Sequence, residues 1–138
     1  MLSLLILIVP LVAIVLFAGC APDLDQEIQK YDGAIELDPA NAGAYNNRGW
    51  AYYYSGDLDQ AIQNFSKAIE LDPRLAIAFY NRGKACRDVG ELELAVSDFE
   101  RYIELAPTAS NRVEVMNTLG MLKAEQIDHH LRKESVVP

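Results

Sequence analysis

The chain has 138 residues, which suits a single domain, and 51% of them are hydrophobic, which is enough for a core. Acidic residues outnumber basic ones by 20 to 12 and give a net charge of −8. This charge excludes a general electrostatic attraction to nucleic acid or to an anionic membrane surface, so we expect no nucleic-acid partner.

The first predicted element is an apolar N-terminal segment. Residues 2–18 are apolar apart from Ser3 and Pro10. A run of this kind is either a secretory signal or a membrane anchor. Its end, the motif FAGC that finishes at Cys20, resembles the bacterial lipoprotein box, in which small residues precede a cysteine that is diacylated and becomes the new N-terminus.

This resemblance implies a signal with a lipobox in residues 1–20, lipidation of Cys20 (palmitate or a related acyl chain) and attachment to a membrane of the cell envelope. If the cell is Gram-negative, Ala21 in place of an aspartate implies the outer membrane, facing the periplasm. The alternative is an uncleaved single-pass anchor. In both cases Cys20 is unavailable for a disulfide, so we expect Cys86 to be a small buried apolar residue.

The rest of the chain repeats itself with a period of 34 residues. Shifted by this distance, the segment 58–73 is identical to 24–39 at 11 of 16 positions, and the opposite shift brings it onto 92–107. A fixed period of this size is the signature of a stacked repeat array.

Each repeat unit reads as a pair of helices. In the unit 42–75, helical spacing of apolar residues predicts a helix over 42–55. Gly56 is then suited to a left-handed cap, and Asp57 begins a second helix that Pro73 stops. The unit is therefore predicted to be two antiparallel helices joined by a tight turn.

The unit resembles the tetratricopeptide repeat (TPR), a 34-residue pattern with conserved spacing of aromatic, glycine, alanine and proline positions. The resemblance implies an all-α solenoid of antiparallel helix pairs. The matching residues in the two units are Tyr45, Gly49, Tyr52, Ala61, Phe65 and Pro73, and then Phe79, Gly83, Ala95, Phe99 and Pro107. Arg48 and Arg82 depart from the pattern, because leucine is commonest at their position.

The predicted order is a half repeat over 23–39, full repeats over 42–75 and 76–109, and a capping helix over 110–134. Together these amount to three repeats, the minimum that buries a continuous core. The expected apolar side of the cap consists of Val113, Met116, Leu119, Leu122, Ile127 and Leu131.

In the TPR family the first helix of each unit lines a concave surface, and the second helices form the outer wall. The three predicted second helices carry net charges of −4, −3 and −4, whereas the first helices carry +1 and +2 and the cap carries 0. The acidity therefore belongs to the outer wall, and the inner wall is neutral to basic.

The first helices also carry aromatic, amide and cationic side chains that core packing does not require. Such a surface suits a short extended peptide with an apolar and an acidic element. The family's clamp for a C-terminal carboxylate has a lysine where Asn46 and Tyr80 stand, so we do not expect that variant. The predicted groove residues are Asn46, Asn47, Trp50, Tyr53, Tyr54, Tyr80, Asn81, Lys84 and Arg87.

We expect no enzymatic activity, cofactor or metal, because the sequence contains no nucleophile–base pair, phosphate loop or metal-ligand spacing. The adjacent His129 and His130 point to different sides of a helix and make a poor chelate. The leading hypothesis is a membrane-tethered scaffold or adaptor that binds a partner's peptide segment during cell-envelope assembly. The alternative is a self-associating structural lipoprotein without a separate ligand, and the sequence leaves the oligomeric state open.

Overall fold

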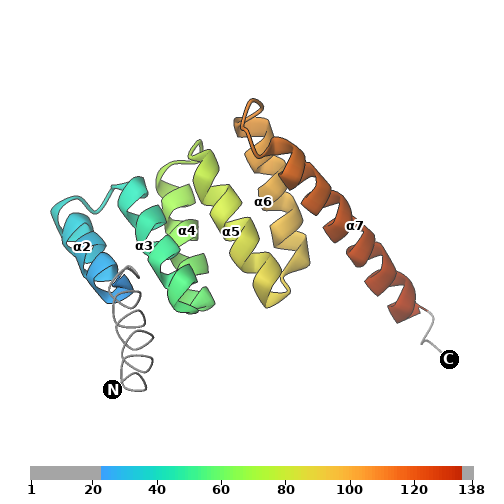
Figure 1. Ribbon diagram of the computed structural model, residues 1–138, viewed down its shortest axis with the longest axis horizontal. Coiled ribbons are helices and arrows are strands. Elements are labelled where there is room, and N and C mark those ends of the chain that lie inside the picture. The colour runs from blue at the N-terminus through green and yellow to red at the C-terminus, as the bar shows by residue number, and fades with distance from the viewer. Residues whose placement is uncertain (1–22, 135–138) are drawn as a thin grey trace, which may run out of the picture.

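The computed structural model describes residues 23–134, which fold as six helices without strands. Figure 1 shows these helices following one another across the molecule in chain order, with α2 and α7 at opposite ends. The predicted all-α solenoid of antiparallel pairs is confirmed. The helices are α2 Leu24–Leu37, α3 Ala42–Ser55, α4 Leu58–Leu71, α5 Ala76–Val89, α6 Leu92–Leu105 and α7 Arg112–Glu134.

The predicted membrane segment, including Cys20, lies outside the described residues. Among the helices that are described, none is both long enough and apolar enough to cross a bilayer.

Polar caps and two glycines set the ends of the helices. The side chains of Asp23, Asn41 and Asp57 each accept a hydrogen bond from the backbone N–H three residues later, which caps α2, α3 and α4. Gly56 and Gly90 adopt left-handed conformations, with φ of 88° and 86°, in the turns that follow α3 and α5. The predicted turn at Gly56 is therefore confirmed.

Glycine is required where the two helices of each repeat cross. A Cβ atom added to Gly49 would lie 2.8 Å from the ring of Phe65, and one added to Gly83 would lie 3.1 Å from the ring of Phe99. A larger residue at either position would have to displace an aromatic ring of the core. The close approach of α3 to α4, and of α5 to α6, depends on these two positions.

The two arginines that depart from the family pattern connect neighbouring repeats. Arg82 donates two hydrogen bonds of 2.8 Å to the buried carboxylate of Asp98 on α6, and a third to the hydroxyl of Ser66 on α4. Arg48 likewise donates a hydrogen bond to Asn64 on α4 and another to Asp32 on α2. Each arginine therefore ties its helix both to its own partner and to the preceding pair.

The larger core cluster joins α5, α6 and α7. Phe79, Phe99 and Tyr102 pack in it around the fully buried Cys86. Burial raises the pKa of the Cys86 thiol to about 11, so the side chain stays neutral. The expectation that Cys86 is a small buried apolar residue is confirmed.

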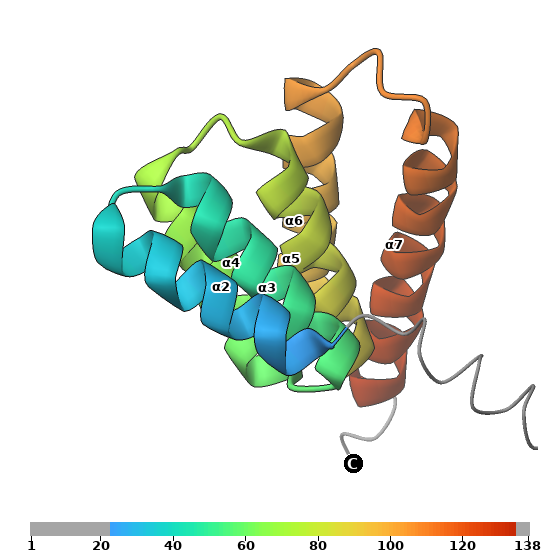
Figure 2. The same ribbon diagram turned by 60° about the vertical axis from the view of Figure 1, so that its left-hand side comes forward.

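α7 packs through a narrower face than the one predicted. Val115 and Leu122 are buried and Leu119 is partly buried, whereas the prediction included Leu119 and Leu122 but not Val115. A helix with a neighbour on one side buries only one stripe, here at spacings of four and three residues. Figure 2 shows α7 at the edge of the array. The predicted core residues that are in fact exposed are Val113, Met116, Ile127 and Leu131.

Candidate functional site

A hollow of about 470 Å³ lies between α2 and the first helices of the two full repeats, α3 and α5. It contains apolar, amide and charged side chains from all three helices. Seven of the nine predicted groove residues are among them. The lining consists of Glu27, Tyr31, Asn46, Asn47, Trp50, Tyr54, Ile77, Tyr80, Asn81 and Lys84.

The apolar part of the hollow is open to solvent, and its aromatic rings pack against one another or against the core. Trp50 is 41% exposed and Tyr54 53% exposed, and their ring centroids lie 4.3 Å apart on successive turns of α3. On α5, Ile77 is also exposed, and Tyr80 packs against Tyr102 of the core with a centroid distance of 5.1 Å. Rigid aromatic groups of this kind lose little conformational entropy when they bind a ligand.

Three asparagines form a chain of amides along the hollow. The Asn81 side-chain nitrogen donates to the Asn46 oxygen at 3.0 Å, and the Asn46 nitrogen donates to the Asn47 oxygen at 3.2 Å. Asn46 is buried and joins the two repeats. Within residues 23–134, the Asn47 side-chain nitrogen and the Asn81 side-chain oxygen have no partner, so one donor and one acceptor remain for a ligand.

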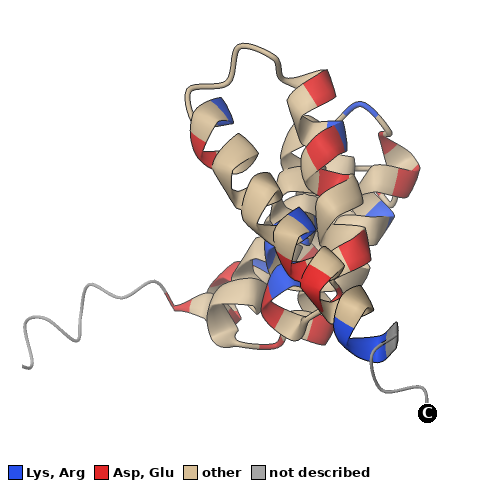
Figure 3. Cartoon of the chain, turned by 90° about the vertical axis from the view of Figure 1, so that its right-hand side faces the viewer, with Lys and Arg blue, Asp and Glu red and all other residues tan. Residues whose placement is uncertain are grey.

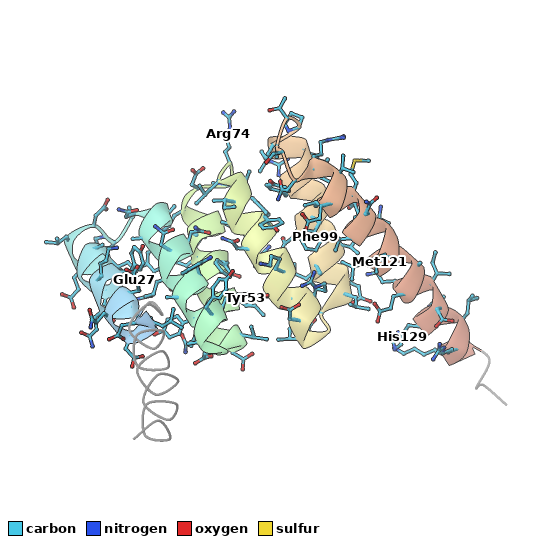
Figure 4. The ribbon with its side chains drawn as sticks, in the orientation of Figure 1. Glu27, Tyr53, Arg74, Phe99, Met121 and His129 are labelled. Carbon is cyan, nitrogen blue, oxygen red and sulfur yellow. The ribbon has the colours of Figure 1, made fainter. Side chains whose placement is uncertain are left out.

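The charges in the hollow lie on opposite sides. Lys84 of α5 is the cation of the described lining, and its Nζ atom lies 5.0 Å from the ring centre of Tyr53 and 5.8 Å from that of Tyr80. Glu27 of α2 is the anion. Figure 4 labels Glu27 on α2 and Tyr53 on α3. A bound chain would therefore meet a positive side near α5 and a negative side near α2.

The structure places two predicted groove residues, Tyr53 and Arg87, outside this lining, where both bind Asp88. The Tyr53 hydroxyl donates to Asp88 Oδ2 at 2.5 Å, and the Arg87 guanidinium donates to Asp88 Oδ1 at 2.8 Å. Burial and this hydrogen bond raise the pKa of Tyr53 to about 12. Burial alone would raise the pKa of Asp88, but the bonds from Tyr53 and Arg87 lower it. These side chains connect α3 to α5.

Sequence reasoning missed three residues of the lining, Ile77 on α5 and the pair Glu27 and Tyr31 on α2. Glu27 and Tyr31 occupy the repeat positions of Ala61 and Phe65, which pack against the first helix of their own unit. No described helix precedes α2, so these two side chains line the hollow instead. The 34-residue period, combined with a described array that begins at a second helix, could have identified Glu27 and Tyr31.

Within residues 23–134, no group of three or more His, Cys, Asp or Glu side chains is placed to hold a metal ion. Figure 4 shows His129 near the C-terminal end of α7, far along the chain from the hollow.

Comparison with known families identifies the repeats. Profiles described as tetratricopeptide repeat match residues 30–63 and 76–108, and a profile described as TPR repeat matches residues 49–90. The chain belongs to the tetratricopeptide-repeat family.

Solved TPR domains resemble the chain over most of its length. The first TPR of Spaghetti (RPAP3), bound to the HSP90 peptide SRMEEVD, is 28% identical with a TM-score of 0.69, over 75% of this chain and 80% of that one. The second TPR of Spaghetti, bound to the same peptide, is 33% identical with a TM-score of 0.60, over 61% and 78%. The first TPR domain of human RPAP3 is 26% identical with a TM-score of 0.70, over 76% and 83%. No curated protein sequence matches the chain significantly.

Proposed function

We propose that this protein is a membrane-tethered adaptor that binds a short segment of a partner protein in the hollow during assembly of the cell envelope. The observation that carries the proposal is the exposed pair Trp50 and Tyr54 beside Lys84 and two amides with free hydrogen-bonding groups. A volume of about 470 Å³ accommodates a few side chains rather than a folded domain.

The chemistry of the lining specifies the segment. Trp50, Ile77 and Tyr80 offer a surface for one apolar side chain, and Lys84 attracts an acidic group. The free donor of Asn47 and the free acceptor of Asn81 suit the C=O and N–H groups of an extended backbone. The proposed ligand is therefore an extended segment in which an apolar residue is followed or preceded by Asp or Glu.

Two related TPR domains support this choice, because both were solved with the peptide SRMEEVD, which combines apolar and acidic residues. This chain differs in having buried Asn46 and core-packed Tyr80 where the terminal-carboxylate clamp of the family has lysine. With Lys84 as the cation of the described lining, we propose an internal acidic segment rather than a chain end.

The proposed tether rests on the lipobox-like motif at Cys20. The acidic second helices would not attract an anionic lipid surface, so an anchor, rather than the folded repeats, would hold the protein at a membrane.

Site-specific photo-crosslinking in intact envelope membranes tests the proposal. A photoreactive residue in place of Tyr54, in the hollow, should capture a partner through a segment with the composition described above. The matched control is the same residue in place of Leu94, which is exposed on α6 at the outer wall. Capture of the same partner from Leu94 and not from Tyr54 would contradict the proposed site.

A further inference from the structure

The two ends of the described helix array lack opposite halves of a repeat. Helix α2 is a second helix whose first helix is absent from residues 23–134, and α7 is a first helix that no second helix follows within the same residues. Figure 3 looks at the α7 end and shows an uncharged stretch of α7, which corresponds to residues 115–122.

α7 is a first helix in register, after an insertion of three residues. Its buried residues Val115 and Leu122 follow Ala78 and Ala85 of α5 by 37 positions, rather than 34, and all four are buried against the preceding pair. α7 therefore presents to α6 the positions that α5 presents to α4. The positions of α5 that contact α6, the second helix of the same repeat, must therefore have equivalents on α7.

In each full repeat an aromatic ring of the second helix covers a glycine of the first helix. The corresponding glycine of α7 is not covered by any described residue. Gly120 follows Gly83 by the same 37 residues, but an added Cβ at Gly120 meets no described atom within 4 Å, whereas one at Gly83 meets the ring of Phe99. Beside Gly120 lies a hollow of about 550 Å³ between α6 and α7. Its lining is Glu100, Ile103, Glu104, Met116, Leu119, Gly120 and Lys123.

The chain itself carries the helix that fits this place. Tyr31 of α2 stands 34 residues before Phe65 and 68 before Phe99, the two rings that cover the glycines of the full repeats. We propose that α2 of one copy docks against α7 of a second copy, with Tyr31 over Gly120, so that copies join head to tail and each junction completes one repeat.

Charge complementarity selects α2 as the occupant. One turn along from the glycine–aromatic crossing, Cys86 of α5 and Ala95 of α6 are both fully buried in the core that the two helices share. At the junction the equivalent residues are Lys123 and Glu27, which carry opposite charges. Each now pairs with another side chain of its own copy. Docking α7 on α7 would instead bring two Lys123 side chains together.

A junction of this kind has consequences for assembly and for the ligand hollow. It joins different surfaces of the two copies, so it leaves one free end of each type and permits chains or closed rings. Tyr31 and Glu27 also line the hollow, so docking of α7 would cover its α2 side.

The test is the mass of the detergent-solubilised full chain by sedimentation over a range of concentrations, without peptide. Gly120→Leu and Gly33→Leu form a matched pair, because both glycines lie in helices and an added Cβ at either meets no described atom within 4 Å. Gly33 lies away from Tyr31 on α2, at the repeat position of the exposed Arg101. Circular dichroism checks that both variants fold.

We expect the mass of the wild type and of Gly33→Leu to rise with concentration, and Gly120→Leu to associate at least tenfold more weakly. A wild type that stays monomeric, or a Gly120→Leu variant that associates like Gly33→Leu, would overturn the proposal. So would capture of a different protein on α7 by a wild type that does not self-associate.

A charge exchange tests the register separately. Glu27→Lys and Lys123→Glu should each weaken association, since each brings like charges together at every junction, and the double variant should restore it. If the double variant stays as weak as the single ones, then α2 does not meet α7 in this register.

Discussion

At the scale of single residues, the ion pair between Arg82 and Asp98 distinguishes this chain most clearly from the family pattern. The side chain of Asp98 is 2% exposed, and both of its oxygens accept hydrogen bonds from Arg82. These bonds raise the pKa of Arg82 against the opposing effect of burial. The sequence showed only that leucine was missing here, because the partner sixteen residues away is recognisable only once the helices are paired.

Arg82→Ala should lower the free energy of unfolding by about 3–5 kcal/mol, because it leaves the buried carboxylate of Asp98 without a partner. Replacing both residues by leucine should recover most of that loss. The control is Arg101→Ala, which removes an exposed pair with Glu104 and should cost about 1 kcal/mol or less. Urea denaturation followed by circular dichroism measures all three, and equal effects of Arg82→Ala and Arg101→Ala would contradict the description of this pair.

Cys86 predicts a pH dependence of stability. Its pKa is raised from 9.0 to about 11 by burial, so the unfolded chain ionises this thiol first as the pH rises. The folded state then binds more protons than the unfolded state, and stability falls between about pH 9 and pH 11. The denaturation midpoint of Cys86→Ala, compared with that of the wild type across this range, should lack this component. If the stability of the wild type and of Cys86→Ala changed with pH in the same way, the folded state would not hinder ionisation of the thiol.

At the scale of helices, local signals predicted the repeats well, and α7 shows where such signals fail. The predicted first helix 42–55 coincides with α3, because the polar cap at Asn41 and the glycine turn at Gly56 that bound it are encoded within a few residues. The buried face of α7 depends instead on how many helices pack against it. Its apolar residues Met116 and Ile127 were therefore assigned to the core although they are exposed.

The glycines test the helix crossings. Gly83→Leu should cost about 1–3 kcal/mol of stability, because its side chain must displace the ring of Phe99. Gly120→Ala should instead stabilise the monomer by about 0.5–1 kcal/mol, since alanine favours the helix and meets no described neighbour there. Thermal melts of both variants at low concentration measure these effects. A Gly83→Leu variant as stable as the wild type would mean that α5 and α6 do not cross at this glycine.

At the scale of the whole molecule, the sequence located the hollow but not its full lining. The spacing of residues along α3 and α5 was enough to predict that Trp50, Tyr80 and Lys84 share one surface, and all three line the hollow. Tyr53 was assigned to the same surface, but its hydroxyl binds Asp88 on the neighbouring repeat, and that contact depends on the angle between repeats. Glu27 was missed because its exposure depends on the absence of a described helix before α2.

The proposed membrane tether makes its own prediction. If Cys20 is acylated, Cys20→Ser should block processing and leave a precursor about 2 kDa heavier, the mass of the uncleaved apolar segment. Incorporation of a fatty-acid analogue should disappear with it. An unprocessed and unlabelled wild type would instead favour a plain membrane anchor.

The cation of the hollow should act mainly on the rate of encounter. Lys84→Glu should slow association of an acidic segment, and the effect should shrink as salt is raised, because the charge steers the ligand from the partly exposed side of the hollow. Stopped-flow measurements at low and high salt test this. Association rates equal to those of the wild type at low salt would exclude Lys84 from the path of the ligand.

The central claim, that the hollow binds a peptide segment of a partner, is tested most directly at Trp50, the single tryptophan of the chain. Titration with the segment mapped by crosslinking should change the fluorescence of Trp50. Trp50→Ala should weaken binding by about 2 kcal/mol, roughly thirtyfold, measured by anisotropy of the labelled segment, while Leu94→Ala should bind like the wild type. Unchanged affinity in a folded Trp50→Ala variant would contradict the claim and direct attention to the acidic outer helices.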